Sequence, residues 1–280
     1  MLLQRVITAV VLLALLLPAL LAHAVWPFAL IVLAMLTAAG WEWARLNGLG
    51  GPAALALGAV LLGVGALALQ RALAHPAPPW LWWAVLPCWV LGGALALRRG
   101  VPGWPLWPRA LRLVLGVAIL ALAGVAMTQS KVIGVNFLLS VLCLVWVADI
   151  AAYFGGRAFG RRKLALSISP GKSWEGVWSG MVAVLLLAAG WLALDARGLG
   201  DSASVYSRML QLWGWPGLVA GVLFLAGMSV VGDLFESLVK RSAGAKDSSA
   251  LLPGHGGVLD RIDALLPVLP LALALTAGAA

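Results

Sequence analysis

The sequence is poor in charge, in cysteine and in histidine. Only 10% of its 280 residues are charged, whereas 63% are hydrophobic. A soluble domain has about 25% charged residues, so the composition excludes an ordinary soluble protein. Cys88 and Cys143 have no metal-ligand spacing, and we expect both to be packing residues without a disulfide. His255 has no second His or Cys at ligand spacing, so a zinc site is not expected either.

Long apolar runs make up most of what is present. A helix needs about 20 apolar residues to cross a bilayer, and several windows reach this length. We predict nine spans, at about 6–23, 25–43, 53–70, 79–97, 110–127, 132–154, 175–194, 212–235 and 262–279. The segments between them are short and rich in Gly, Pro and charge. The predicted fold is therefore an all-α polytopic integral membrane protein with about nine transmembrane helices.

The chain has no visible internal repeat, and we expect one membrane domain over residues 1–280. Within it, residues 1–130 are expected to form N-terminal transmembrane helices. Residues 131–280 are expected to form a catalytic core with cytosolic loops at 155–174 and 236–261. The N-terminus resembles a signal peptide, with Ala22-His23-Ala24 as a cleavage motif. Because the next apolar run follows at once, we expect this first run to remain as an anchor.

The distribution of Lys and Arg predicts the orientation of the chain. With the N-terminus placed in the cytosol, Arg71, Lys131, Arg197 and Arg208 fall outside, and the rest of the 19 cations fall inside. Such an excess of cations is typical of cytosolic loops. The net charge of +9 then lies on a face suited to anionic headgroups and nucleotides, and nothing indicates a nucleic-acid partner. A bacterial inner membrane is the expected location.

Carboxylates within the spans are candidates for function. Asp149 and Asp233 each lie near the predicted cytosolic end of a span, where a short charged side chain is costly unless it faces a cavity or a partner. Asp233, Ser237 and Lys240 have the i, i+4, i+7 spacing of one helix face, and Asp260 and Asp263 have an i, i+3 spacing. Facing carboxylates repel each other unless a cation lies between them, and oxygen ligands favour Mg²⁺. The spacing thus suggests a magnesium site between Asp233 and Asp260.

A glycine-rich turn and a set of cations accompany these acids. The turn Pro253-Gly254-His255-Gly256-Gly257 leads into the last predicted helix, and such a turn lets backbone N–H groups approach an anion. Phosphate oxygens could also accept hydrogen bonds from four nearby cations, Lys240, Arg241, Lys246 and Arg261. An ordinary basic loop would explain the cations but would leave the interleaved acids and glycines unexplained.

A second polar segment runs from residue 149 to residue 176. Asp149 and Tyr153 share a helix face there, and Ser169 before Pro170 has the pattern of a helix N-cap followed by proline. The triplet Gly171-Lys172-Ser173 suggests a phosphate-binding P-loop. That motif requires an earlier glycine where the chain has Leu166, and a preceding strand, so a P-loop is rejected.

In these two segments the chain resembles the phosphatidate cytidylyltransferases, also called CDP-diacylglycerol synthases. The family signature S-x-x-K-R, K-D and P-x-H-G-G-x-x-D-R-x-D is matched in register from Ser237 to Asp263. A second family segment matches from Asp149 to Gly176, with Gly171 where lysine is common and Ser173 in place of threonine. The motifs cover about the last 130 residues, and the earlier spans agree only in character.

The resemblance implies Mg²⁺-dependent transfer of CMP from CTP to phosphatidate at the cytosolic face. Asp233 and Asp260 would hold the metal with support from Asp263, and the number of metals, including a second cation, stays open. The catalytic set would be Asp233, Asp260, Lys240, Lys246 and Arg261. Substrate contacts are expected from Ser237, Arg241, Asp247, His255, Gly256, Gly257, Lys172, Ser173, Asp149 and Tyr153. A homodimer is expected from the resemblance alone.

Two other functions are compatible with a polytopic membrane chain. A CTP-using polyprenol or phytol kinase has a related C-terminal region, but the intact Lys-Asp to Asp-Arg-x-Asp signature favours the cytidylyltransferase. A transporter would carry charges near mid-membrane and often has repeated halves. Here the charges lie at one predicted end of the spans and no repeat is visible, so a transporter is disfavoured.

Overall fold

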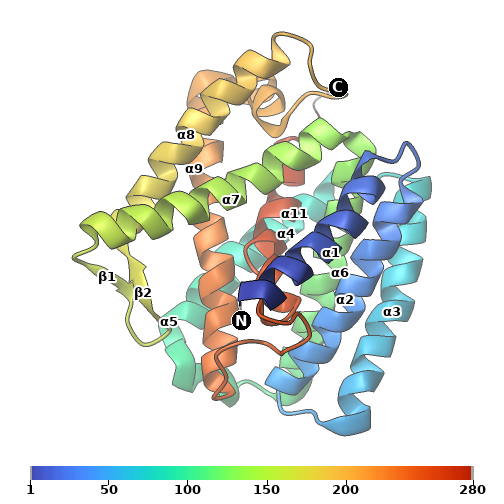
Figure 1. Cartoon of the computed structure of the whole chain (residues 1–280), viewed down its shortest axis with the longest axis vertical. Helices are drawn as coiled ribbons and strands as arrows, with labels where there is room; N and C mark the ends of the chain where they lie inside the picture. Colours follow the sequence, from blue (N-terminus) through green and yellow to red (C-terminus); the bar gives the residue numbers. More distant parts are fainter. Residues whose placement is uncertain (1, 279–280) are drawn as a thin grey trace.

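The computed structural model describes residues 2–278, with side chains from residue 6 onward (Figure 1). The helices in chain order are α1 (Leu2–Leu21), α2 (Trp26–Leu46), α3 (Gly51–Ala74), α4 (Pro79–Pro87), the π-helix η1 (Cys88–Gly92), α5 (Gly93–Gly103), the 3₁₀ turn η2 (Trp104–Leu106), α6 (Arg109–Ile133), α7 (Val135–Phe159), α8 (Trp174–Asp195), α9 (Val205–Ser242), α10 (Leu259–Ile262) and α11 (Leu265–Leu275). Two short strands, β1 (Lys163–Ala165) and β2 (Ser169–Ser173), form an antiparallel hairpin between α7 and α8.

Within the described residues, seven helical segments are long and apolar enough to cross a bilayer. They are Trp26–Leu46, Gly51–Ala74, Pro79–Leu106, Arg109–Ile133, Val135–Phe159, Trp174–Asp195 and Val205–Ser242. This confirms an all-α polytopic membrane protein. The predicted first and last spans, 6–23 and 262–279, are helical over most of their described residues, and residue 279 lies outside them. The apolar part of α1 (Val6–Leu21) and α11 are shorter than the seven long helices. The total of nine spans therefore stays a prediction.

The last helix forms the centre of the bundle. In Figure 1, α11 lies behind α1, and it packs against α9, α6, α4 and α7. Every residue from Leu265 to Ala274 is buried, so α11 has no face that requires polar side chains. The chain is thus folded around α11, which follows the glycine-rich turn after the single-turn helix α10. The position of that turn is fixed by the surrounding helices.

The expected cytosolic loop at 236–261 was wrong at both ends. Helix α9 continues to Ser242, and a kink at Gly214 (φ 64°) joins its first turns to the rest, so the helix is longer than the predicted span 212–235. Pro216 lies in the first turn of the helix that resumes after Gly214, a position where its missing N–H costs little. The nonhelical segment is therefore 243–258, which we call the catalytic loop, and α10 already begins at Leu259.

The expected loop at 155–174 is also more ordered than predicted. Helix α7 extends to Phe159, and the β1–β2 hairpin occupies most of the remainder. The expectation that Ser169 caps a helix was wrong, because Ser169 begins β2. The N-cap of α8 is Ser173, whose Oγ accepts a hydrogen bond of 3.2 Å from the Gly176 N–H.

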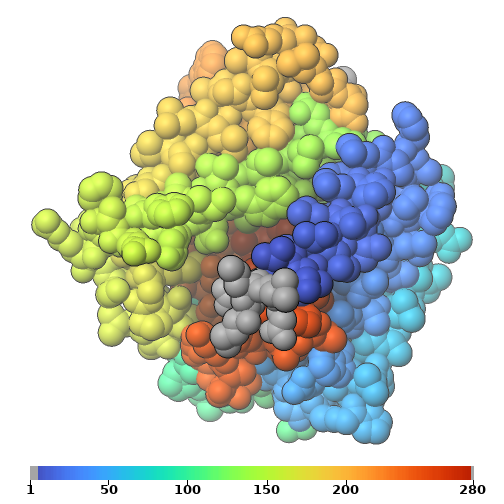
Figure 2. Space-filling model, in the orientation of Figure 1, coloured from blue at the N-terminus to red at the C-terminus, as the bar shows by residue number. Residues whose placement is uncertain are grey.

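Polar residues gather at the two ends of the bundle. At one end, the Thr8 hydroxyl of α1 donates to the Pro253 carbonyl of the catalytic loop, so α1 and this loop share one face, as the charge distribution predicts. In Figure 2 the orange-red catalytic loop lies on this face near the blue α1. At the other end, Trp213 donates to the Leu275 carbonyl at the end of α11. The side of the membrane on which each end lies remains a prediction.

Candidate active site

A cavity of about 860 Å³ opens among α7, the β1–β2 hairpin, the start of α8, α9 and α10. We call it the main cavity. Eight of the predicted site residues line it, namely Asp149, Tyr153, Lys172, Ser173, Asp233, Asp260, Arg261 and Asp263. The two polar segments that the sequence pairs only by resemblance are therefore adjacent in space.

The hairpin contributes a cation to the main cavity. Lys172 on β2 forms an ion pair with Asp233 on α9, with 2.6 Å between Nζ and Oδ2. Lys163 lies opposite Ser173 across the hairpin and also lines the cavity. Both side chains of the ion pair are about a quarter exposed, so they are accessible from the cavity. The pair holds the hairpin against α9 while leaving a cation beside the carboxylates.

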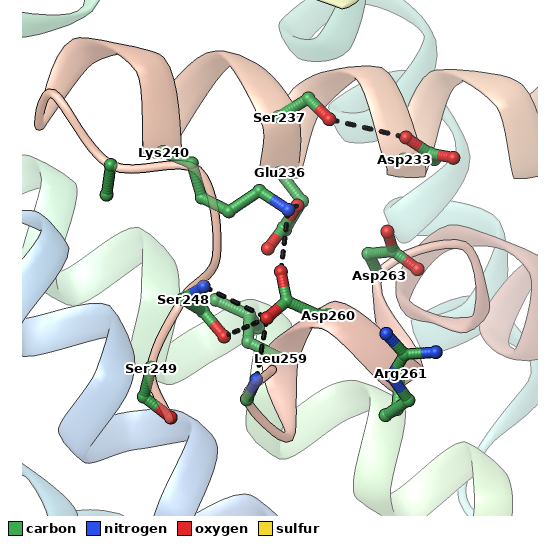
Figure 3. A network of polar contacts seen from close by, with 12 residues as sticks. Asp233, Glu236, Ser237, Lys240, Ser248, Ser249, Leu259, Asp260, Arg261 and Asp263 are labelled. Atoms are coloured by element: carbon green, nitrogen blue, oxygen red, sulfur yellow. Dashed lines mark hydrogen bonds and ion pairs between the residues drawn. The ribbon is translucent and has the colours of Figure 1, made fainter. Parts of the chain in front are cut away.

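Two carboxylates meet where α9 crosses the α10–α11 junction. The backbone of Asp263 packs directly on Gly232, where a Cβ would lie 2.5 Å from the Asp263 carbonyl oxygen. This close approach brings Asp263 next to Asp233, and in Figure 3 its carboxylate points toward that residue. The pairing of residues from two helices was predicted, although the prediction placed Asp260 opposite Asp233.

Asp260 instead faces Lys240. The Lys240 Nζ is 2.6 Å from Asp260 Oδ1 and 2.6 Å from Glu236 Oε2, so one cation lies between two carboxylates (Figure 3). These side chains are almost inaccessible, at 12% exposed for Lys240, 7% for Asp260 and 1% for Glu236. Lys240, predicted as a phosphate ligand, is in this arrangement the counter-ion of a buried acidic pair.

The second oxygen of Asp260 is held by the catalytic loop. Its Oδ2 accepts hydrogen bonds from the Ser248 N–H at 2.9 Å, the Ser248 hydroxyl at 2.8 Å and the Gly257 N–H at 2.7 Å. Burial raises the pKa of Asp260, but the hydrogen bonds from Lys240, Gly257 and Ser248 outweigh it and lower the pKa to about 2. Asp260 is thus an anion at neutral pH, rigidly oriented by the loop.

A second cavity, of about 530 Å³, lies within the catalytic loop. Four further predicted residues line it, namely Lys246, Asp247, His255 and Gly256. Arg261 lines both cavities, and its guanidinium donates a 2.7 Å hydrogen bond to the His255 carbonyl. We call this the loop cavity. The predicted site is therefore two neighbouring polar cavities joined at Arg261.

Four predicted residues line neither cavity, namely Lys240, described above, and Ser237, Arg241 and Gly257. The Ser237 hydroxyl is 3.4 Å from Asp233 Oδ1, and the Gly257 N–H donates to Asp260, so both orient carboxylates. Arg241 donates to the Ile168 carbonyl before β2 and to the Ala245 carbonyl of the catalytic loop. Arg241 thus links the hairpin to the loop, which explains a cation at this position without direct phosphate contact.

The sequence analysis missed Glu42 as part of the site. Glu42 on α2 is fully buried and accepts hydrogen bonds from the Ser248 and Ser249 hydroxyls and from the Val258 and Leu259 N–H groups. A carboxylate within an apolar span is itself a sign of function. The sequence around Glu42, however, gives no indication that its partners lie more than 200 positions away. Arg157 was counted only as a loop charge, and it lines the main cavity.

The carboxylates of the main cavity fit a magnesium ion better than a transition metal. Within residues 6–278, no three His, Cys, Asp or Glu side chains are grouped as ligands for a metal ion. Mg²⁺ needs only one or two carboxylates, because water and substrate phosphates complete its coordination. Asp233 and Asp263 could supply these two, whereas Oδ2 of Asp260 already accepts three hydrogen bonds.

Comparison with known proteins matches nearly the whole chain to one protein family. Residues 3–277 match the cytidylyltransferase family. A protein named phosphatidate cytidylyltransferase from Pseudomonas aeruginosa is 40% identical over 98% of this chain and 97% of its own length. A protein of the same name from Haemophilus influenzae is 47% identical over 49% of this chain and 44% of its own length. Another from Bacillus subtilis is 37% identical over 49% of this chain and 46% of its own length.

Proposed function

The chain belongs to the cytidylyltransferase family, and we propose that it transfers CMP from CTP to phosphatidate, giving CDP-diacylglycerol and pyrophosphate. The observation that carries this proposal is the main cavity, where carboxylates and cations meet beside helices long enough to span a bilayer. A phosphatidate oxygen would attack the α-phosphorus of CTP, forming one P–O bond as the bond to the β-phosphate oxygen breaks. The electron pair of the broken bond leaves with pyrophosphate.

This reaction requires little acid–base chemistry. The attacking phosphate oxygen is already anionic at neutral pH, so no strong base has to remove a proton. The main obstacles are repulsion between two polyanions and charge on the departing pyrophosphate, which fixed cations can offset. Lys172, Lys163 and Arg157 would bind phosphate in the main cavity, with Tyr153 and Ser173 beside them. Lys246, His255 and Arg261 would bind phosphate in the loop cavity, shaped by Gly256 and Asp247.

We propose that Mg²⁺ binds Asp233 and Asp263, with Asp260 close by; Asp149 lines the same cavity. The metal would supply charge to the phosphates of the bound nucleotide. Lys172 would then be released from Asp233 to contact substrate, while Lys240 stays paired with Asp260 and Glu236. Ser237 and Arg241 would hold Asp233 and the hairpin in place.

The position of the lipid follows from α7. Trp146 and Tyr153 line the main cavity, yet they are 47% and 61% exposed, and Ile150 on the same side of the helix is 57% exposed. Their spacing forms a helix face that continues from the cavity to the apolar surface. Phosphatidate would place its headgroup by Asp149 and Lys172 and leave its acyl chains in the bilayer. The site would face the cytosol at a bacterial inner membrane, and a homodimer remains part of the proposal.

The decisive test is the fate of label from CTP in purified protein with phosphatidate and Mg²⁺. Label from the α-phosphate is expected in the lipid, and label from the γ-phosphate in pyrophosphate. Lipid labelled from the γ-phosphate would instead identify a CTP-dependent lipid kinase, and the proposal would be wrong. Omission of Mg²⁺, with EDTA present, is expected to stop both products.

A further inference from the structure

Glu42 connects the N-terminal half of the chain to the catalytic loop. It lies near the end of α2, and its side chain is fully buried. Its two oxygens accept four hydrogen bonds from the other end of the sequence. Oε1 accepts from the Ser249 hydroxyl at 2.5 Å and the Val258 N–H at 2.9 Å. Oε2 accepts from the Leu259 N–H at 2.7 Å and the Ser248 hydroxyl at 3.2 Å.

The two backbone contacts fix the start of α10. Val258 is the N-cap residue of this four-residue helix, which has no cap from its own side chains. The first N–H groups of a helix have no partner within it, and here Glu42 accepts two of them. Asp260 and Arg261 belong to this single turn, so their positions depend on how the turn is anchored.

Ser248 extends the connection to Asp260. Its hydroxyl lies 3.2 Å from Glu42 Oε2 and 2.8 Å from Asp260 Oδ2, between the two carboxylates. Gly257 completes the close packing, because any Cβ there would overlap Glu42 Oε1 and Ser248 Oγ. Four donors and a glycine thus surround a carboxylate that lines neither the main cavity nor the loop cavity.

We propose that Glu42 is a positioning residue for the reaction: through the α10 N-terminus and Ser248 it fixes Asp260 and Arg261 in their reactive orientation. The proposal rests on the proposed function for the identity of the reaction. All four hydrogen-bond partners of this carboxylate lie outside α2, in the catalytic loop and at the start of α10. Burying a charge is costly unless its oxygens are satisfied, and these donors satisfy both oxygens of Glu42.

The matched substitution is Glu42→Gln, which keeps the shape of the side chain. Hydroxyls can reorient to face an amide NH₂, but backbone N–H groups cannot, so the Val258 or Leu259 N–H loses its acceptor. We expect kcat for CDP-diacylglycerol formation to fall at least tenfold, with KM for CTP changed less than threefold. The control is Thr8→Val, which removes an exposed contact to Pro253 in the same loop and should keep kcat within twofold.

A second readout does not depend on the reaction. Lys246 is exposed in the catalytic loop, so trypsin cleavage there reports whether the loop is held. Glu42→Gln should be cleaved at least fivefold faster than wild type, and Thr8→Val at the wild-type rate. If wild type makes no CDP-diacylglycerol but the variant is cleaved faster, the proposed function fails and the anchoring stands. Wild-type cleavage together with wild-type kcat in Glu42→Gln would overturn the inference.

Folding is measured alongside, by the thermal unfolding midpoint in detergent, and kcat is expressed per folded protein. A loss of activity that matches the loss of folded protein would also overturn a positioning role. If Glu42→Gln does not fold, Ser248→Ala interrupts the same connection one step later. We expect its kcat to fall at least fivefold with an unchanged KM for CTP, and a kcat within twofold of wild type would refute the inference.

Discussion

Lys172 on β2 and Asp233 on α9 form a 2.6 Å ion pair at the wall of the main cavity. The pair joins the two polar segments of the sequence, and it places a cation beside a carboxylate expected to bind metal. A phosphate-bearing substrate and a metal ion would each satisfy one partner of this pair. The pair therefore holds the hairpin against α9, and in the proposed reaction it would separate as nucleotide and metal bind.

Replacement of Lys172 by methionine tests this arrangement. Lys172→Met keeps the apolar stem and removes the charge, so substrate phosphates lose a cation and Asp233 loses its partner. We expect CDP-diacylglycerol synthesis to fall about 10²-fold, the typical effect of losing one electrostatic contact to a transition state. Labelled CTP incorporation into lipid measures it. Arg197→Met, an exposed cation outside the cavities, should remain near wild type; equal rates for both variants would remove Lys172 from the site.

Asp260→Asn should abolish pyrophosphate release that depends on CTP and phosphatidate. Asparagine has one oxygen and one NH₂ group, so a donor must face either Lys240 or the Ser248 and Gly257 N–H groups. Activity is expected to fall more than 10²-fold while the protein still inserts into membranes and elutes as wild type in detergent. Retained activity would show that neither metal binding nor loop geometry requires this carboxylate.

The membrane class could be predicted from sequence, because composition, apolar length and helical spacing are local properties. Twelve of the sixteen predicted site residues also line one of the two cavities. Asp233 and Lys172 both line the main cavity as the motifs suggest. Which carboxylate faces which could not be predicted. That depends on the close approach of Asp263 to Gly232, and on Lys240 lying between Glu236 and Asp260, both of which are tertiary contacts.

The length of the ordered elements was underestimated for a related reason. Charge and glycine mark the end of an apolar span, but they do not end a helix whose polar side chains find partners. Glu236 and Lys240 are such a case, since both lie in the helical part of the predicted loop and pair with each other. Glu42 was overlooked because its partners are in the catalytic loop, far away in sequence.

Gly257→Ala should disrupt the catalytic loop by overpacking. The added Cβ would overlap Ser248 Oγ and Glu42 Oε1, and both of these side chains are buried. Overpacking of this kind costs about 1–3 kcal/mol of stability, and here it would also displace an N–H donor of Asp260. We expect a lower unfolding midpoint and more than tenfold less product. Gly190→Ala is the control, because Gly190 is helical with no atom within 4 Å of a new Cβ; loss of activity there too would show general sensitivity to added methyl groups.

Asp201 provides a pH test away from the site. Its carboxylate accepts hydrogen bonds of 2.8 Å from the Val135 and Asn136 N–H groups at the start of α7. Burial raises the pKa of Asp201, but these hydrogen bonds outweigh it and hold the pKa below its ordinary value. A lowered folded pKa means that the stabilisation is fully present above the unfolded pKa of about 4 and is lost as pH falls through the folded value.

Asp201→Asn should therefore lower stability by about 1 kcal/mol at pH 7, as loss of a helix cap does, and the difference from wild type should shrink at pH 3. Unfolding midpoints in detergent at both pH values measure the stability of Asp201→Asn and wild type. Arg197→Gln serves as a control whose effect should not depend on pH. A stability difference between Asp201→Asn and wild type that persists unchanged at pH 3 would contradict capping by the Asp201 anion.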